Sequence, residues 1–193
     1  MQRASDGASN TGSTGDEREG YTCRMVTDDQ LSELVARVAR WALGAKLRIV
    51  TAESCTGGWI AKVFTDVAGS SRWFECSYVT YSNQAKVRDL GVLQRTLDEH
   101  GAVSERTVRE MAAGALRVSG AEVAIAVSGV AGPDGGSDEK PVGTVWFCAG
   151  RKAPGHEPHL IAEGALFGGN REEVRRASVR RALELLLQLE QRA

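Results

Sequence analysis

The sequence predicts one α/β domain built on a mixed, mainly parallel β-sheet. Segments with helical periodicity alternate with short apolar runs along most of the chain, which is typical of parallel strands connected by helices. Two late apolar runs, Thr144–Ala149 and His159–Leu166, are separated by a link too short for a helical crossover, so they predict an antiparallel hairpin. The length of 193 residues suits a single hydrophobic core.

The N-terminal segment predicts a tail followed by a helix. Residues 1–24 are rich in Gly, Ser, Thr, Asp and Glu and show no apolar period, so we expect a disordered tail there and the domain over residues 25–193. Thr27 or Asp28 is a suitable N-cap for the next segment, whose apolar residues recur with helical spacing. Gly44 is expected to end this helix.

The other expected elements follow in order along the chain. They are strand Leu47–Val50, helix Gly58–Val67, strand Glu75–Tyr81, helix Asn83–Asp89, helix Glu105–Val118, strand Glu122–Ser128, the two hairpin strands and helix Arg171–Leu189. Asn170 is expected to cap the last helix, with Glu172 and Glu173 in its positive first turn. The arginines of that helix are expected on a solvated face; they are Arg171, Arg175, Arg176, Arg180 and Arg181.

Composition and charge favour an intracellular protein that binds a small molecule. The 24 Lys and Arg nearly cancel the 25 Asp and Glu, so the chain has no overall field to hold a nucleic acid or an anionic membrane. No apolar stretch approaches the ~20 residues of a membrane-spanning helix, and the N-terminus lacks the order of a signal peptide. The cysteines lie far apart without a Cys-x-x-Cys pair, which is typical of reduced proteins, so we expect a cytoplasmic location.

The segment Thr51–Gly58 predicts a sharp turn from a strand into a helix. The first free N–H groups of such a helix can face a bound anion or an activated nucleophile. Ser54 and Thr56 are both favoured helix caps, and on spacing alone a structural cap is the better interpretation. Two candidate caps leave one hydroxyl free for a ligand, and the pair Gly57 and Gly58 allows another molecule to approach the backbone closely.

Cys55 offers a different nucleophile at the same turn, because a thiol at a helix N-terminus has a lowered pKa. A cysteine amidase usually needs a histidine partner, and His100, His156 and His159 all fall in loops or strand edges without a recognisable signature. A buried, inert thiol is therefore the favoured interpretation of Cys55. His156 and His159 also lack the carboxylate or cysteine cluster of a metal site, so no metal is expected.

Lys86 lies near the start of a helix that Ser82 is expected to cap. The helix macrodipole mildly disfavours an ammonium group there, and a partly desolvated lysine at that position can act as a base. From position alone, a solvated lysine paired with Asp89 is the favoured interpretation.

The glycine-rich loop Ser128–Gly143 follows the carboxyl end of an apolar strand, which is where ligands bind in open α/β sheets. It matches neither the Walker pattern nor the dinucleotide fingerprint, and a ligand loop is favoured over a plain surface loop. Arg171 has two equally supported interpretations. It forms an ion pair with Glu172 or Glu173, or it grips a phosphate together with the helix N-terminus.

Five motifs occur in a fixed order along the chain. They are Ala52–Gly58, Val79–Lys86, His100–Ser104, Gly129–Gly136 and Lys140–Val145. Together they resemble the CinA C-terminal domain family, whose enzymatic members are PncC-type nicotinamide-nucleotide amidohydrolases. The resemblance runs from about Thr27 to the C-terminus, and five motifs together are highly specific.

The resemblance implies a fold, an activity and roles for particular residues. The family fold is a three-layer α/β/α sandwich on a mixed sheet. The family activity is hydrolysis of the carboxamide of nicotinamide mononucleotide to nicotinate mononucleotide and ammonia, without a metal or other cofactor. Carried onto this chain, the family's nucleophile matches Ser54, its lysine base matches Lys86 and its site tyrosine matches Tyr81. The family context also implies a homo-oligomer.

Two positions and one segment depart from the family pattern. The family usually has Thr where this chain has Ser128, and Asp where this chain has Asn170 before Arg171. Many members also carry a larger N-terminal domain associated with ADP-ribose pyrophosphatase activity, which this sequence lacks. Only the amidohydrolase half is therefore implied.

The implied mechanism is acyl transfer, in which Lys86 takes the proton of Ser54 and the amides of Cys55–Gly58 stabilise the oxyanion. Tyr81 and Ser128 are expected to orient this pair or relay its proton, and the glycine loop and Arg171 to hold the ribose phosphate. The expected substrate-binding residues are Thr56, Gly57, Gly58, Ser128, Gly129, Gly132 and Arg171. The alternative is a non-catalytic nucleotide-binding module related to competence or the DNA-damage response.

Overall fold

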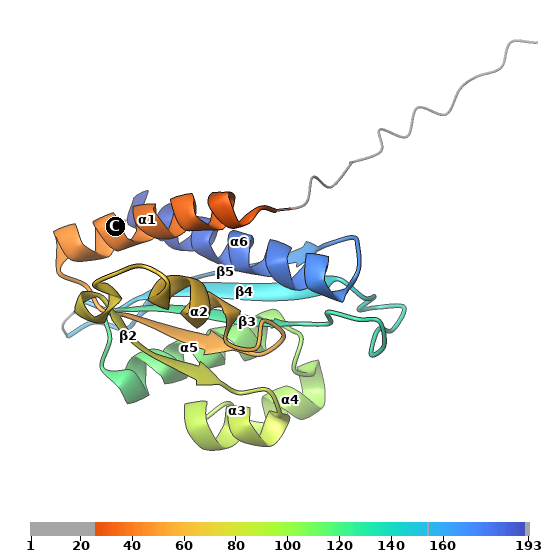
Figure 1. Ribbon diagram of the computed structural model, residues 1–193. Helices are drawn as coiled ribbons and strands as arrows, with labels where there is room; N and C mark the ends of the chain where they lie inside the picture. The colour runs from red at the N-terminus through yellow and green to blue at the C-terminus, as the bar shows by residue number, and fades with distance from the viewer. Residues whose placement is uncertain (1–25, 154, 192–193) are drawn as a thin grey trace, which may run out of the picture.

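The computed structural model describes residues 26–153 and 155–191 as a five-stranded sheet with helices on both faces (Figure 1). The tail expected over residues 1–24 lies outside the described residues. The strands are β1 (Ile49–Glu53), β2 (Phe74–Val79), β3 (Val123–Gly129), β4 (Thr144–Arg151) and β5 (His159–Leu166). They lie side by side in the order β2-β1-β3-β4-β5.

Strand β4 runs against the direction of the other four. β1 pairs in parallel with β2 and with β3, whereas β4 pairs antiparallel with both β3 and β5. The predicted mixed, mainly parallel sheet with a late hairpin is therefore confirmed. The register aligns Glu53 with Val79 of β2 and with Val127 of β3, so the carboxyl ends of these three strands meet at one edge.

The helices form one layer on each face of the sheet (Figure 1). The first layer contains α1 (Asp28–Ala45), α2 (Trp59–Thr65) and α6 (Arg171–Gln191), and the second contains α3 (Asn83–Leu90), α4 (Gln94–His100) and α5 (Glu105–Ser119). A short 3₁₀ turn, η1 (Ser70–Arg72), connects α2 to β2. The three-layer α/β/α sandwich is confirmed. Among the described helices, none combines the length and the apolar character needed to cross a bilayer.

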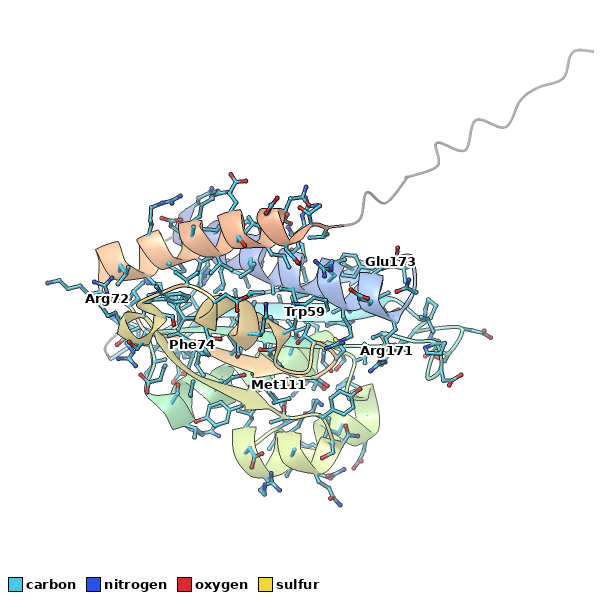
Figure 2. The ribbon with its side chains drawn as sticks, viewed as in Figure 1. Trp59, Arg72, Phe74, Met111, Arg171 and Glu173 are labelled. Carbon is cyan, nitrogen blue, oxygen red and sulfur yellow. The ribbon has the colours of Figure 1, made fainter. Side chains whose placement is uncertain are left out.

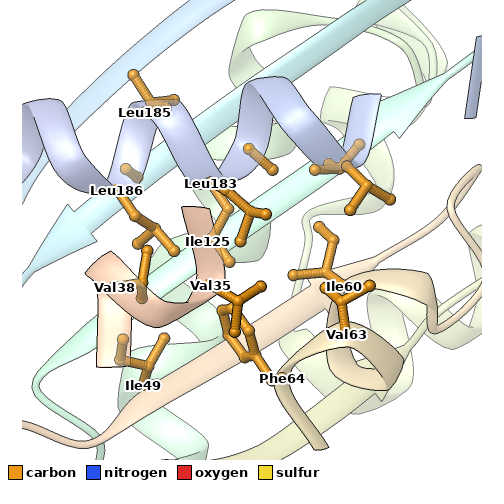
Figure 3. Close-up of a cluster of buried hydrophobic side chains, with 14 of the residues drawn as sticks. Val35, Val38, Ile49, Ile60, Val63, Phe64, Ile125, Leu183, Leu185 and Leu186 are labelled. Carbon is orange, nitrogen blue, oxygen red and sulfur yellow. The ribbon is translucent and has the colours of Figure 1, made fainter. Parts of the chain in front are cut away.

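Each helix layer packs on its own apolar core, because successive side chains of a strand point to opposite faces of the sheet. Ile125 of β3 contributes to the core under α1, α2 and α6. Figure 3 shows Ile125 in the same cluster of buried side chains as Phe64 and Leu183. Its neighbour Ala124 belongs to the other core, together with Met111 of α5. Burial of each large apolar side chain stabilises the fold by roughly 1.5–3 kcal/mol, which makes the sheet a rigid platform for the loops at its edge.

Helix α1 begins as expected but ends later. Thr27 Oγ1 accepts the Gln30 N–H at 3.2 Å, and the Gln30 side chain accepts the Thr27 N–H at 3.1 Å, which forms a capping box. The expected end at Gly44 is wrong. The helix continues to Ala45 and closes at Lys46, whose φ of 57° lies in the left-handed region.

Two further differences concern β1 and α4. The strand expected over Leu47–Val50 extends from Ile49 to Glu53, because Thr51 and Glu53 are buried with hydrogen-bond partners inside the protein. The sequence does not predict α4, since only Thr96 and Leu97 of that helix are buried and no apolar period results. The remaining expected elements agree with the structure within two residues at each end.

Candidate active site

Ser54 is the first residue after β1, and strand geometry directs its side chain to the opposite face from that of Glu53. Its backbone N–H donates to Val127 O at 3.0 Å, which fixes the turn against β3. The side chain is largely buried, with 8% of the residue exposed. Ser54 is thus held at the sheet edge and faces the layer that contains α3.

Glu53 is fully buried beneath the start of α2. Its carboxylate accepts the Thr56 hydroxyl at 2.7 Å and the backbone N–H groups of Gly58 at 3.0 Å, Ile60 at 3.1 Å and Ala61 at 2.9 Å. These donors compensate the burial of the carboxylate, which also lies at the positive end of the helix. The prediction that a serine or threonine caps this helix is wrong, because the strand residue Glu53 satisfies its first amides. No standard capping pattern signals this role in the sequence.

Lys86 is 1% exposed and reaches Ser54 from the first turns of α3. Its Nζ lies 3.0 Å from Ser54 Oγ and donates to Thr80 O at 2.7 Å. Burial lowers the pKa of Lys86 to about 8, an effect only partly opposed by the neighbouring Cys55. The solvated interpretation is wrong, since Asp89 accepts its hydrogen bonds from Arg88 instead.

Thr80 holds Lys86 through its backbone carbonyl oxygen, while its own hydroxyl is buried without a partner among the described residues. Thr80 is 1% exposed, and its Oγ1 has no hydrogen-bond partner among the described residues. Its N–H donates to Glu53 O at 2.9 Å, which places the end of β2 beside the turn after β1. The sequence gives no signal for Thr80, because its contribution comes from the carbonyl oxygen that every residue carries.

Cys55 has the properties of the inert thiol favoured by the sequence. It is 5% exposed, and burial raises the pKa of its thiol to about 12, so the thiolate is strongly disfavoured. His100, His156 and His159 are exposed, and none of them lines the pocket beside Cys55. No histidine among the described residues is therefore placed to act as the base of this thiol.

A pocket of about 260 Å³ opens beside Ser54 at the carboxyl edge of the sheet. Its lining residues are Ser54, Cys55, Tyr81, Gly129, Val130, Ala131, Gly132, Asp134, Gly135 and Arg171. The structure therefore brings together the turn after β1, the tyrosine after β2, the glycine-rich loop after β3 and the start of α6. Larger surface hollows of about 530 and 510 Å³ share none of these lining residues.

Arg171 connects two walls of this pocket. Its Nη1 donates to Gly132 O at 2.8 Å, and its Nη2 donates to the Tyr81 hydroxyl at 2.9 Å. The interpretation in which it pairs with a neighbouring glutamate is not supported, because Glu173 accepts the Asn170 N–H at 2.7 Å and Glu172 pairs with Arg176. Tyr81 is 60% exposed and forms no described hydrogen bond with Ser54 or Lys86, so it lies at the rim.

Asn170 caps α6 as expected, with Oδ1 accepting the N–H groups of Glu172 at 2.9 Å and Glu173 at 3.1 Å. These two amides are therefore already satisfied within the protein. An anion at this end of α6 depends on the guanidinium of Arg171 rather than on those amides. The amide that replaces the family's aspartate here keeps the capping function.

The remaining predicted binding residues differ in how they are placed. The Thr56 hydroxyl is turned away from the pocket toward Glu53 and is fully buried. Gly57 and Gly58 have φ angles of 62° and 91°, a region that favours glycine. Ser128 is 1% exposed and pairs with Trp146 across the sheet, without a described hydrogen bond from its hydroxyl to Ser54 or Lys86.

Gly129 lines the pocket, but its lack of a side chain serves packing against β4. A Cβ at this position would lie 2.7 Å from Val145 Cγ2 and 2.9 Å from Thr144 O. Gly132 has a φ of 79° and contributes the carbonyl that Arg171 holds. The two glycines therefore act through different features of their backbone.

Three arginines of α6 are not on the solvated face that the sequence predicts. Arg175 donates to the carbonyl oxygens of Cys55 and Thr56, Arg176 pairs with Asp28, and Arg181 pairs with Glu163. Arg175 and Arg176 both stack on Trp59, which Figure 2 shows beside the first turns of α6. The contacts of Arg175 with Cys55 and Thr56 join residues 120 and 119 positions apart, so no local sequence pattern predicts them.

Comparisons with known proteins identify related chains. Residues 31–189 match the model of the CinA C-terminal domain family. The nicotinamide-nucleotide amidohydrolase PncC of Escherichia coli strain K12 is 51% identical over 164 residues, which cover 84% of this chain and 96% of that protein. The protein of the same name from Pseudomonas putida is 50% identical over 161 residues, covering 83% of this chain and 98% of that protein.

A solved structure supports the same relationship. The competence/damage inducible protein CihA from Agrobacterium tumefaciens superimposes with a TM-score of 0.79 at 43% sequence identity, covering 83% of this chain and 95% of that one. The family match over residues 31–189 includes all five strands and every residue that lines the pocket. By sequence and by fold, the chain belongs to the CinA C-terminal domain family.

Proposed function

We propose that this chain hydrolyses the carboxamide of nicotinamide mononucleotide to nicotinate mononucleotide and ammonia. The observation that carries the proposal is the distance of 3.0 Å between Lys86 Nζ and Ser54 Oγ at the wall of a pocket. A buried lysine with a lowered pKa beside a serine hydroxyl is the arrangement of a nucleophile and its base. Relatives that are about half identical over nearly their whole length carry the name nicotinamide-nucleotide amidohydrolase, which supports this choice of substrate.

The first step is attack on the amide. With a pKa of about 8, roughly one tenth of Lys86 is neutral at pH 7. The neutral amine takes the proton of Ser54 as Oγ bonds to the carboxamide carbon, and the electron pair of the carbonyl moves onto its oxygen. Thr80 O holds the lysine in line throughout, since it accepts from the same Nζ.

The oxyanion then needs hydrogen-bond donors near Ser54. Among the amides of the turn, Gly57 N–H donates to Ser54 O and Gly58 N–H donates to Glu53, so neither is free. The amides of Cys55 and Thr56 donate to no other described residue. These two are the proposed oxyanion donors, and one such donor typically contributes about 3–4 kcal/mol to transition-state stabilisation.

Collapse of the tetrahedral intermediate completes the cycle. The Lys86 ammonium donates its proton to the amide nitrogen, the C–N bond breaks and ammonia leaves. Water then attacks the Ser54 acyl group with Lys86 again as the base, and nicotinate mononucleotide is released. Each proton taken by Lys86 is returned, so the enzyme is regenerated.

The nucleotide part of the substrate is assigned to the rim of the pocket. Arg171 presents a guanidinium there that is positioned by Gly132 O and the Tyr81 hydroxyl. We assign the phosphate to this guanidinium, because a planar fork of donors suits phosphate oxygens. The glycine-rich loop then covers the ribose. A cytoplasmic location and a homo-oligomeric state remain predictions from the cysteine pattern and the family.

Ammonia release from nicotinamide mononucleotide, with chromatographic detection of nicotinate mononucleotide, tests the proposal. The wild-type chain is expected to form both products, and Ser54→Ala and Lys86→Met to form neither while keeping their fold by circular dichroism. Cys55→Ala is the matched control and is expected to retain activity. If activity survived in Ser54→Ala and were lost in Cys55→Ala, the nucleophile would be the thiol of Cys55 and not the hydroxyl of Ser54.

A non-catalytic nucleotide-binding module is the second candidate, favoured by the name of the Agrobacterium tumefaciens structure, which refers to competence and damage induction. Such a module binds nicotinamide mononucleotide without turnover. Calorimetric binding to the wild-type chain with no release of ammonia would support it over the amidohydrolase.

A further inference from the structure

Arg175 of α6 lies against the turn that carries Ser54. Its Nε donates to Cys55 O at 3.1 Å, and its Nη2 donates to Thr56 O at 2.7 Å. The guanidinium also stacks on Trp59, 5.2 Å from the ring centroid. The Arg175 guanidinium thus binds the carbonyl oxygens of two consecutive residues of the turn. The carboxylate of Glu53 binds backbone N–H groups at the start of α2.

Because a peptide group is planar, fixing the direction of its C=O also fixes the direction of its N–H. In a trans peptide the C=O and N–H bonds point in opposite directions. Holding Cys55 O toward Arg175 therefore directs the Thr56 N–H away from α6. The carbonyl of Thr56 shares its peptide with the Gly57 N–H, which donates to Ser54 O at 3.0 Å. Ser54 O in turn shares its peptide with the Cys55 N–H.

Arg175 consequently fixes both peptides that carry the unpaired amides of the turn. It holds the peptide of the Thr56 N–H directly, and it holds the peptide of the Cys55 N–H through the hydrogen bond of Gly57. We infer that Arg175 is a positioning residue that keeps the oxyanion-binding amides of Cys55 and Thr56 in place. The inference rests on the proposed function, because the oxyanion forms only when Ser54 attacks a carbonyl.

Fixed donors are effective in catalysis because they need no reorganisation when charge develops. Without the guanidinium, the two peptides can rotate and their carbonyls must find other donors. The expected defect lies in the transition state rather than in substrate binding, so it should lower kcat and leave KM nearly unchanged.

Arg176 is a matched control for Arg175. It is the next residue on the same helix and stacks on the same Trp59 ring at 5.0 Å. It pairs with Asp28 and Glu172 and forms no described hydrogen bond with the turn. Removal of Arg176 therefore takes away an α6 arginine and its stacking without freeing the carbonyls of Cys55 and Thr56.

Steady-state kinetics with nicotinamide mononucleotide form the first test. Arg175→Ala is expected to lower kcat by about 10–100-fold with KM within about threefold of wild type, and Arg176→Ala to keep kcat within about threefold. Guanidinium at millimolar concentration should raise kcat of Arg175→Ala by about fivefold or more and leave Arg176→Ala unaffected. Unchanged kcat in Arg175→Ala, an equal loss in Arg176→Ala or a defect confined to KM would overturn the inference.

Arg175→Lys covers the case in which Arg175→Ala fails to fold. It keeps the positive charge but places a single ammonium where two separate donors are needed, so its kcat should remain at least about fivefold below wild type. Wild-type kcat in this variant would also overturn the inference. Thermal unfolding of each variant shows that the compared proteins are folded.

A fluorophosphonate probe separates this inference from the choice of substrate. In that reaction Ser54 Oγ bonds to phosphorus, fluoride leaves, Lys86 takes the proton and the phosphoryl oxygen occupies the oxyanion site. Labelling of Ser54 in Arg175→Ala should be about tenfold slower than in wild type, with Arg176→Ala nearly unchanged. If wild type is labelled but does not deamidate nicotinamide mononucleotide, the proposed substrate fails while this comparison still decides the role of Arg175. Equal labelling rates, or no labelling of wild type, would overturn the inference.

Discussion

The carboxylate of Glu53 accepts the backbone N–H of Gly58 at 3.0 Å and so ties the end of β1 to the start of α2 across the turn that carries Ser54. Gly58 has no side chain with which to cap the helix, and its φ of 91° suits glycine. The preceding strand therefore supplies the acceptor that a capping side chain normally provides. The nucleophile candidate and the helix cap are adjacent residues that face opposite sides of the sheet.

Glu53→Ala should destabilise the fold strongly, because it leaves three backbone N–H groups and the Thr56 hydroxyl without their acceptor. Each buried unsatisfied donor costs about 1–3 kcal/mol, so a total loss of at least about 3 kcal/mol is expected in urea unfolding. Glu53→Gln retains one carbonyl oxygen and should lose less. The exposed Glu33→Ala is the control, with an expected change below about 0.5 kcal/mol. A stable Glu53→Ala protein would show that water replaces the carboxylate.

Local sequence patterns predict most of the fold and only part of the site. Helical periodicity and apolar runs identify β2, β3, β5 and α5 because these features depend on neighbours along the chain. Glu53 and Arg175 are not predicted, because their roles arise when a strand end meets a helix start and when α6 packs over it. Lys86 is misjudged from position alone, since its burial depends on the packing of α3 beside the turn.

The lowered pKa of Lys86 sets the expected pH dependence of activity. The base must be neutral, and burial lowers its pKa to about 8. Below that value kcat/KM should rise about tenfold per pH unit, and above it the profile should level off. Lys62→Ala, which removes a lysine that pairs with Asp66 on the surface, should show the same profile. A flat profile from about pH 6.5 to 9 would exclude Lys86 as the base.

The same pKa predicts a pH dependence of stability with a defined sign. The folded-state pKa of Lys86 is about 8 against 10.5 for the ordinary group, so the unfolded chain binds the additional proton between these values. The free energy of unfolding should therefore increase as pH rises from about 8 to about 10.5. Below pH 8 the cost of burying the charged lysine is constant, so Lys86 contributes no pH dependence there.

Lys86→Met isolates this contribution. The buried thiols of Cys55 and Cys148 have raised pKa values and act with the opposite sign at high pH, but they are present in both proteins. The difference in unfolding free energy between wild type and Lys86→Met should shift in favour of wild type over this pH range. A constant difference, measured by urea unfolding at several pH values, would show that the lysine titrates normally in the folded protein.

Gly129→Ala should affect stability first, although Gly129 lines the pocket. The new Cβ would lie within 3 Å of Val145 Cγ2 and Thr144 O, so β3 and β4 must move apart. Overpacking of this kind typically costs about 1–3 kcal/mol, which thermal and urea unfolding can measure. Gly168→Ala is the control, because no heavy atom lies within 4 Å of a Cβ there. A fully stable Gly129→Ala protein with a raised KM would instead indicate that a ligand approaches this glycine closely.

Arg171→Ala should weaken binding of substrates that carry a phosphate and spare those that do not. Its guanidinium is held by Gly132 O and the Tyr81 hydroxyl at the pocket rim, where we place the phosphate. Loss of charge-assisted hydrogen bonds of about 1.5–3 kcal/mol corresponds to a KM for nicotinamide mononucleotide that is roughly 10–100-fold higher. The KM for nicotinamide riboside should change by less than about threefold.

Arg180→Ala is the control for Arg171→Ala, because Arg180 is an exposed α6 arginine paired with Glu184, and it should change neither KM. Tyr81→Phe removes one partner of Arg171 and should give a smaller change in the same direction. Equal effects of Arg171→Ala on both substrates would show that this arginine maintains the conformation of the glycine-rich loop and does not bind the phosphate.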